Sequence, residues 1–179
     1  MSRRETLLDL LRREPTAFAD AATAFLAESG ATPPRQPVPT PAAFDGPADG
    51  PWDSLLARER RLVWKAWVLA DAPFGVTVAG AAYEDNPLLY ANRTFREMTG
   101  YPMADLRGEN PRLLQGPETD AVAVADLHEA LRTWEPATVE LRNYRADGTP
   151  FRNRVSLLPV TDEAGTVTNW LGVQRRVDE

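Results

Sequence analysis

The chain has 179 residues, a formal net charge of −6 and no cysteine. Its length is sufficient for one medium-sized domain with accessory helices, and a content of 43% hydrophobic and 26% charged residues is typical of a globular protein. The negative charge argues against direct binding to nucleic acid. Without cysteine, the chain can form no disulfide, thiolate metal site or thiol nucleophile.

The composition also argues against a membrane protein and an enzyme. The N-terminal residues interrupt their apolar positions with charges, unlike a secretory signal, and no apolar run reaches the roughly 20 residues of a spanning helix. The sequence has a single histidine and no glycine-rich phosphate loop, so no catalytic constellation is evident. We therefore expect a cytoplasmic, non-enzymatic protein without a metal centre.

The first 72 residues predict helices and a linker. Residues 1–30 form an N-terminal helical segment, in which Pro15 separates two short amphipathic helices. The proline-rich residues 31–51 predict an extended linker, read most simply as a tether. Residues 52–72 predict a helix that flanks the following domain, capped by Asp53 or Ser54. Its apolar side carries Trp64 and Trp67.

Residues 73–179 predict a second unit of class α+β. Two strands, at about 74–79 and 87–91, lead into short helices and a longer helix at about 119–133. Three strands close the chain at about 136–146, 149–160 and 166–176, with a hairpin signal at Asp147–Gly148. This order predicts a five-stranded antiparallel sheet with helices gathered on one face, beside the N-terminal helical extension.

Each closing strand places one amide on an otherwise apolar or small face. Because side chains alternate along a strand, Asn143 shares a face with Leu141, Asn153 with Val155, and Gln174 with Trp170 and Gly172. Each amide alone could cap nearby backbone. A buried amide without a partner costs about 1–3 kcal/mol, so three together suggest a bound heterocycle with alternating C=O and N–H groups, such as the pyrimidine edge of a flavin.

The segment DNPLLYANRTFREMTGYPMADLRGENPRLLQGPETD resembles the core of a LOV domain, the flavin-binding, blue-light-sensing branch of the PAS fold. The family pattern is close to G-R-N-C-R-F-L-Q-G-P-E-T-D, where this chain has G-E-N-P-R-L-L-Q-G-P-E-T-D. The motifs DNP, TGY, LQGPETD and GVQ occur in the expected order, and the resemblance extends from about Phe74 to Arg176.

The resemblance implies a role for each matching position. Asn143 and Asn153 match the asparagines that hold the pyrimidine edge, and Gln174 matches the glutamine near N5 and O4. Asn110 and Gln115 match contacts to the ribityl chain. The arginine that binds the terminal phosphate matches Arg112. The remaining expected lining is Thr77, Asn86, Leu114, Val124, Leu127, His128, Leu131, Val155, Leu157, Trp170 and Gly172.

Three positions depart from the family pattern. Pro111 stands where the adduct-forming cysteine is found, yet proline after an Asn110 N-cap is favourable at a helix start. His128 replaces a second phosphate-binding arginine, and Ala79 replaces a frequent threonine. Histidine binds a phosphate less reliably than arginine, so the change at His128 weakens phosphate recognition. We expect FMN as the bound flavin, and FAD and riboflavin remain alternatives because the phosphate site is weak.

These features predict a Cys-less blue-light photoreceptor that signals by photoreduction to the neutral semiquinone. Candidate electron donors are Trp170, Tyr101, Tyr144 and Trp134. We prefer Trp170 because it lies on the same strand face as Gln174. Rotation of the Gln174 amide would relay the change to the sheet and the N-terminal helices. The alternatives are a light-independent flavin redox sensor, a haem-binding PAS domain using His128, and an interaction module with an empty pocket. The amides argue against haem.

The opposite sheet face predicts the output surface. Tyr144, Leu171 and Val173 form an apolar strip there, which a helix or a second subunit should cover. The helix at 52–72 is the expected cover. We expect a homodimer through this face and helix, and the signalling partner is not identified by the sequence.

Overall fold

The computed structural model describes residues 1–49 and 52–178, apart from the side chain of Ala82. Its centre is a five-stranded antiparallel sheet in the order β2-β1-β5-β4-β3. The strands are β1 (Gly75–Ala79), β2 (Leu88–Ala91), β3 (Ala137–Tyr144), β4 (Pro150–Thr161) and β5 (Val167–Val177). The α+β class and all five predicted strands are confirmed.

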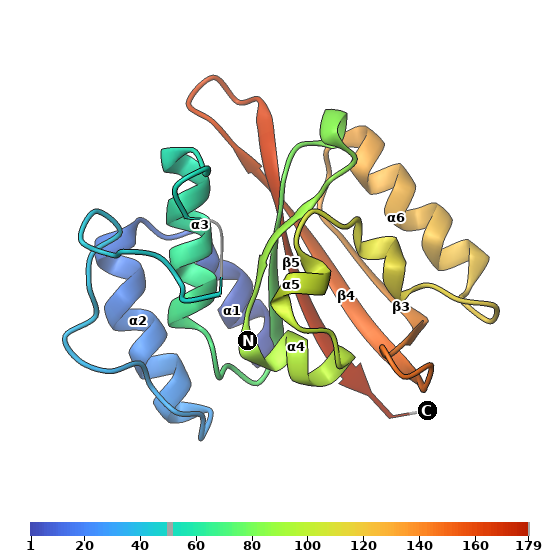
Figure 1. Ribbon diagram of the computed structural model, residues 1–179, viewed down its shortest axis with the longest axis horizontal. Helices are drawn as coiled ribbons and strands as arrows, with labels where there is room; N and C mark the ends of the chain where they lie inside the picture. The colour runs from blue at the N-terminus through green and yellow to red at the C-terminus, as the bar shows by residue number, and fades with distance from the viewer. Residues whose placement is uncertain (50–51, 179) are drawn as a thin grey trace.

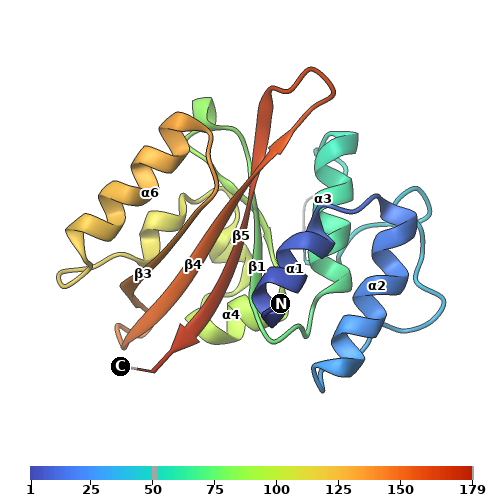
Figure 2. The ribbon, with the colours of Figure 1, turned by 180° about the vertical axis from the view of Figure 1, so that it is seen from behind.

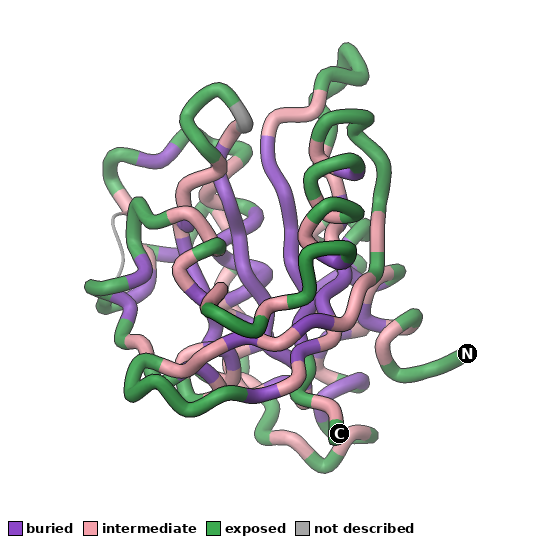
Figure 3. Tube along the Cα trace, turned by 90° about the vertical axis from the view of Figure 1, so that its right-hand side faces the viewer, coloured by how far each residue is buried: buried purple, intermediate pink, exposed green. Residues whose placement is uncertain are grey.

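Two groups of helices enclose the sheet (Figure 1). One face, called the inner face here, carries the helices that lie between β2 and β3 in sequence. They are η1 (Ala82–Glu84), α4 (Arg93–Thr99), α5 (Met103–Leu106), η2 (Pro111–Leu114) and α6 (Ala121–Thr133). The other, outer face carries α1 (Arg3–Leu11) and α3 (Ala57–Val68), and α2 (Pro15–Glu28) packs against these two helices on the side away from the sheet. The central strands are consequently buried between the two layers (Figure 3).

Both α1 and α3 cover the outer face (Figure 2), whereas the sequence predicted only the helix that corresponds to α3 as the cover. Leu171 and Val173 of β5 are each 1% exposed, in one apolar core with the leucines of α1. Arg4 of α1 donates to Ser156 Oγ at 3.4 Å, which ties the helix to β4. Tyr144 is not under this cover: its hydroxyl accepts from Glu118 N at 3.0 Å, in the loop before α6.

The predicted start of the flanking helix is wrong. The helix α3 begins after Leu56 rather than after Asp53 or Ser54. The Glu59 carboxylate accepts the Leu56 N–H at 3.1 Å and so satisfies one donor of the first turn. This is the glutamate half of a capping box, without the bond from an N-cap side chain.

The proline-rich segment packs on α3 instead of hanging free as a tether. Trp64 Nε1 donates to Pro39 O at 2.9 Å, and the Phe44 ring lies 4.4 Å from that of Trp67. Trp64 also contacts Phe18 of α2, with ring centroids 5.4 Å apart. Both tryptophans thus hold the N-terminal segments on α3. Residues 50 and 51 of the predicted linker lie outside the described residues.

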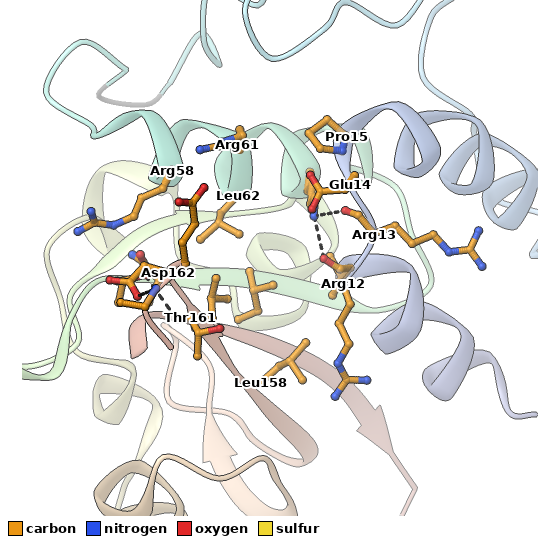
Figure 4. Close-up of a pocket in the computed structure, with 18 residues that line it drawn as sticks. Arg12, Arg13, Glu14, Pro15, Arg58, Arg61, Leu62, Leu158, Thr161 and Asp162 are labelled. Atoms are coloured by element: carbon orange, nitrogen blue, oxygen red, sulfur yellow. Dashed lines mark hydrogen bonds between the residues drawn. The ribbon is translucent and has the colours of Figure 1, made fainter. Parts of the chain in front are cut away.

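A buried lysine joins α3 to the end of α1. Lys65 is 7% exposed, and its Nζ donates to Leu11 O at 2.9 Å and Arg13 O at 2.7 Å. Figure 4 shows the cleft above these contacts, between the α1–α2 turn, α3 and the end of β4. Because the last carbonyls of a helix lack partners within it, the ammonium satisfies Leu11 O at the end of α1, and its bond to Arg13 O ties down the turn that follows.

The burial of Lys65 makes stability depend on pH. Desolvation lowers the pKa of its ammonium from 10.5 to about 8, against the opposing field of Glu14. Between these values the unfolded chain binds more protons, so the free energy of unfolding should rise from pH ~8 to ~10.5 by at most about 3 kcal/mol. We expect Lys65→Met to lack this rise. Urea unfolding of both proteins over that range measures it, and identical pH profiles would refute it.

Candidate functional site

A cavity of about 240 Å³ lies between the inner face of the sheet and the helices η2 and α6. The structure brings all the predicted site residues together there except Val124, which packs beside Ala123, Leu141 and Val155. The predicted residues that line it are Thr77, Asn86, Asn110, Pro111, Arg112, Leu114, Gln115, Leu127, His128, Leu131, Asn143, Asn153, Val155, Leu157, Trp170, Gly172 and Gln174.

Strand register explains why the amides meet. Leu141 pairs with Asn153, Val155 with Gln174, and Leu157 with Gly172, so these residues lie on one face. Thr77 pairs with Gly172 from the neighbouring strand and lies on that face too. The alternation read from the sequence is therefore confirmed across all three strands.

The amides form a partly satisfied hydrogen-bond network. Asn153 Nδ2 donates to Asn143 Oδ1 at 2.8 Å, and Asn143 Nδ2 donates to Leu114 O at 3.3 Å. Gln174 Nε2 donates to Thr77 Oγ1 at 3.2 Å. Asn143 is 3% exposed, Asn153 0% and Gln174 6%. Burial holds these side chains in place, and their mutual bonds fix their orientation.

Four polar atoms of the cavity wall are buried without a hydrogen-bond partner. They are Asn86 Oδ1, Asn153 Oδ1, Trp170 Nε1 and Gln174 Oε1. Only one further side-chain atom of this kind occurs in the described part of the chain, Asn169 Oδ1 on the outer face. An orphaned buried group costs about 1–3 kcal/mol, so the cavity is prepared for a ligand with complementary donors and acceptors.

Gly172 makes room for the side chains beside it. A Cβ at this position would lie 2.4 Å from Thr77 Oγ1 and 2.6 Å from Gln174 Nε2. The absence of a side chain therefore allows the Gln174–Thr77 hydrogen bond to form above the strand. These two side chains occupy the space that the missing side chain leaves.

The motif around Pro111 begins the short 3₁₀ helix η2. Asn110 caps it, since its Oδ1 accepts the Arg112 N–H at 2.9 Å. Pro111 is the first residue of the helix, where its missing N–H is not needed. The helix start is thus preserved, and Pro111 lines the cavity.

Exposed charged side chains stand at the mouth of the cavity. Arg112 does not stand free there: its guanidinium is paired in bidentate fashion with the Asp85 carboxylate. This contact lowers the pKa of Asp85 and raises that of Arg112. The imidazole of His128 also lines the cavity and is exposed.

The cavity is also lined by four residues that were not in the predicted lining: Ala79, Asp85, Phe95 and Leu141. Asp85 belongs to the DNP motif, but only the fold shows that it reaches Arg112, 27 residues away. Phe95 of α4 is 1% exposed and lines the cavity, with no periodicity in the sequence to indicate it. Of the four candidate electron donors, Trp170 alone lines the cavity among the described residues, and Trp134 is 49% exposed at the end of α6.

Comparison with known proteins places this fold and cavity in a family. The family model described as "PAS domain" matches residues 73–177. The LOV domain of the blue-light photoreceptor Aureochrome1 is 40% identical with a TM-score of 0.58, over 60% of this chain and 84% of that one. The LOV domain of the Erythrobacter litoralis EL346 kinase is 38% identical with a TM-score of 0.57, over 60% of this chain and 98% of that one. The chain belongs to the PAS family, in its LOV branch.

Longer curated proteins share this region. The bacterioopsin transcriptional activator of Halobacterium salinarum is 40% identical over 127 residues, which are 71% of this chain and 18% of the relative. The blue-light-activated histidine kinase 2 of Erythrobacter litoralis is 40% identical over 102 residues, 57% of this chain and 30% of the relative. The chain thus spans less than a third of either protein. In the described residues, no helix is long and apolar enough to cross a membrane.

Proposed function

We propose that the chain is a flavin-binding blue-light sensor that works by photoreduction. The main observation that supports this proposal is a set of buried polar atoms without hydrogen-bond partners in one cavity. They belong to Asn86, Asn153, Trp170 and Gln174. A flavin edge offers the alternating donors and acceptors that such a wall lacks. The similarity to solved domains of blue-light receptors supports the same conclusion.

Different side chains of the cavity would bind different parts of the flavin. Asn143 and Asn153 would hold the pyrimidine edge, with Asn143 kept in place by its bond to Leu114 O. Leu127, Leu131 and Leu157 supply apolar walls for a flat ring. Asn110 and Gln115 line the same cavity and would contact the ribityl chain. The site selects a flavin as a class, with FMN as the expected member.

A bound flavin supplies blue-light absorption and accepts an electron when excited. With Pro111 at the thiol position and no cysteine in the sequence, no thiol is present to bond to it. Trp170, buried at 2% exposure with a free Nε1, is the proposed donor. Gln174 would respond through its amide, because Oε1 has no partner and Nε2 is bound to Thr77 by a 3.2 Å hydrogen bond that rotation would break.

The proposed output runs from Gln174 through the sheet. Its neighbour Val173 lies on the opposite face, 1% exposed in the core that includes the α1 leucines. A shift of β5 would therefore reach α1 and α3, and through them the packing of the N-terminal segments. A homodimer through this face would require part of the N-terminal cover to move, since that cover already buries Leu171 and Val173.

Anaerobic illumination tests the photochemical part. In flavin-loaded protein without added reductant, we expect one-electron photoreduction of the chromophore, several-fold slower in Trp170→Phe. Trp134→Phe is the matched control, because Trp134 is exposed and outside the cavity. Equal rates in all three proteins would exclude Trp170 as donor. If reductants convert the flavin in the dark but light does not, the chain is a redox sensor instead.

A further inference from the structure

A cleft on the outer face is separate from the cavity between the sheet and α6. It has a volume of about 790 Å³ and lies between the α1–α2 turn, α3 and the β4–β5 hairpin (Figure 4). Its lining shares no residue with that of the inner-face cavity. The volume lies within the range of small-ligand sites, so the cleft can hold a ligand of its own.

Lys65 places a positive charge in the cleft wall without a carboxylate beside it. The side chain is 7% exposed, and its ammonium contacts the carbonyls of Leu11 and Arg13 and the Phe18 ring, whose centroid is 5.4 Å away. Within the residues that the structure describes, Lys65 forms no ion pair, and Glu14 acts on it only as a field at longer range. A buried charge is costly unless it is paired, so an anionic group in the cleft would supply the missing partner.

The wall near the hairpin carries an unused hydrogen-bond acceptor. Asn169 is 0% exposed and its Oδ1 has no partner, while its Nδ2 donates to Glu59 Oε1 of α3 at 3.3 Å. The hairpin adds two exposed carboxylates, those of Glu163 and of Asp162, whose Oδ1 also holds the hairpin turn. Neither forms an ion pair in the described part of the chain. This end of the cleft therefore favours a positively charged N–H donor.

The charges of the cleft are separated along its length. The mainly basic end comprises Arg12, Arg13, Arg61 and Lys65 with Glu14, and the mainly acidic end comprises Asp162 and Glu163 with Arg58. Lys65 follows Glu59, the contact of Asn169, by six positions on α3, which is about 9 Å along the helix axis. An extended peptide advances about 3.3–3.6 Å per residue, so about three residues span this distance.

We propose that this cleft binds a short peptide of about three residues by its two charged ends. The carboxylate would face Lys65 and Arg61, and the terminal ammonium would face Asn169 Oδ1 and the hairpin carboxylates. An aliphatic side chain between them would rest on the apolar floor, which consists of Leu62, Leu158, Val160 and Leu171. The bound peptide bridges the α1–α2 turn, α3 and the hairpin, and it needs no flavin.

Isothermal titration calorimetry of the purified chain with the tripeptide Ala-Leu-Ala tests the proposal. The C-amidated and N-acetylated forms should each bind about fivefold more weakly than the free tripeptide, because each lacks one terminal charge at a partly exposed site. Ala-Gly-Ala should bind about tenfold more weakly, because it has no side chain for the apolar floor. Binding of inorganic phosphate as tight as that of Ala-Leu-Ala would overturn the proposal in favour of a plain anion site.

Two variants at exposed positions test the two ends separately. Arg61→Gln should weaken binding of the free tripeptide about threefold and leave the amidated form unchanged, and Glu163→Gln should weaken it similarly and leave the acetylated form unchanged. Arg35→Gln is the control, because Arg35 is exposed and outside the cleft, and it should change neither. No binding of Ala-Leu-Ala at millimolar concentration, or equal binding of all four peptides, overturns the proposal.

Discussion

Replacing Asn153 with leucine should weaken flavin binding about 10- to 100-fold and leave the fold intact, because one buried amide is exchanged for an apolar side chain of similar size. Asn153 is fully buried, and its Oδ1 is one of the atoms that lack a partner. Its loss would also free Asn143 Oδ1, which accepts the Asn153 amide at 2.8 Å. The dissociation constant measured by flavin fluorescence, with circular dichroism for the fold, gives the result.

Asn169→Leu is a closely matched control for this variant. Asn169 is likewise 0% exposed with an unpartnered Oδ1, but it lies on the outer face of β5 and donates to Ala79 O at 3.2 Å. It should affect stability and leave flavin affinity unchanged. If Asn153→Leu and Asn169→Leu have the same affinity for flavin, whether that affinity is normal or reduced, the inner-face amides are not the surface that recognises the flavin.

Pro111→Cys should give the protein a new photochemical reaction. Pro111 lines the cavity at the start of η2, and Asn110 continues to cap that helix without it. A thiol at this place should bond reversibly to the excited flavin, seen as bleaching of the blue absorbance band and its recovery in the dark. Mass spectrometry of the illuminated protein, denatured while bleached, would detect the covalent product.

Pro111→Ala distinguishes the thiol from the loss of proline. It opens the same position without sulfur and should keep the photochemistry of the wild type. Absence of dark-reversible bleaching in a folded, flavin-loaded Pro111→Cys protein would show that residue 111 is not close to the reactive face of the ring.

The inner face of the sheet could be predicted because its determinants are local. Side chains alternate along a strand, so the neighbours of Asn143, Asn153 and Gln174 reveal the face that each occupies. The hairpin turn at Asp147–Gly148 sets the register of β3 and β4, which fixes Leu141 opposite Asn153. Position along the resembling motif then identified the lining residues of η2 and α6.

Non-local contacts could not be predicted in this way. The contact of Arg112 with Asp85 depends on a strained turn whose φ values have no glycine signature in the sequence. The cover of the outer face by α1 brings together residues far apart in sequence, as in the contact between Arg4 and Ser156, which are 152 residues apart. Phe44 anchors a proline-rich segment whose composition alone predicts a tether.

The identity of the small molecule held by the purified chain tests flavin binding most directly. Absorption spectroscopy of the protein, followed by mass spectrometry of the compound released on denaturation, determines it. We predict the structured blue absorbance of a flavin and the mass of riboflavin, FMN or FAD. A haem spectrum, or a folded protein that stays colourless after incubation with riboflavin and FMN, would contradict flavin recognition by Asn143, Asn153 and Gln174.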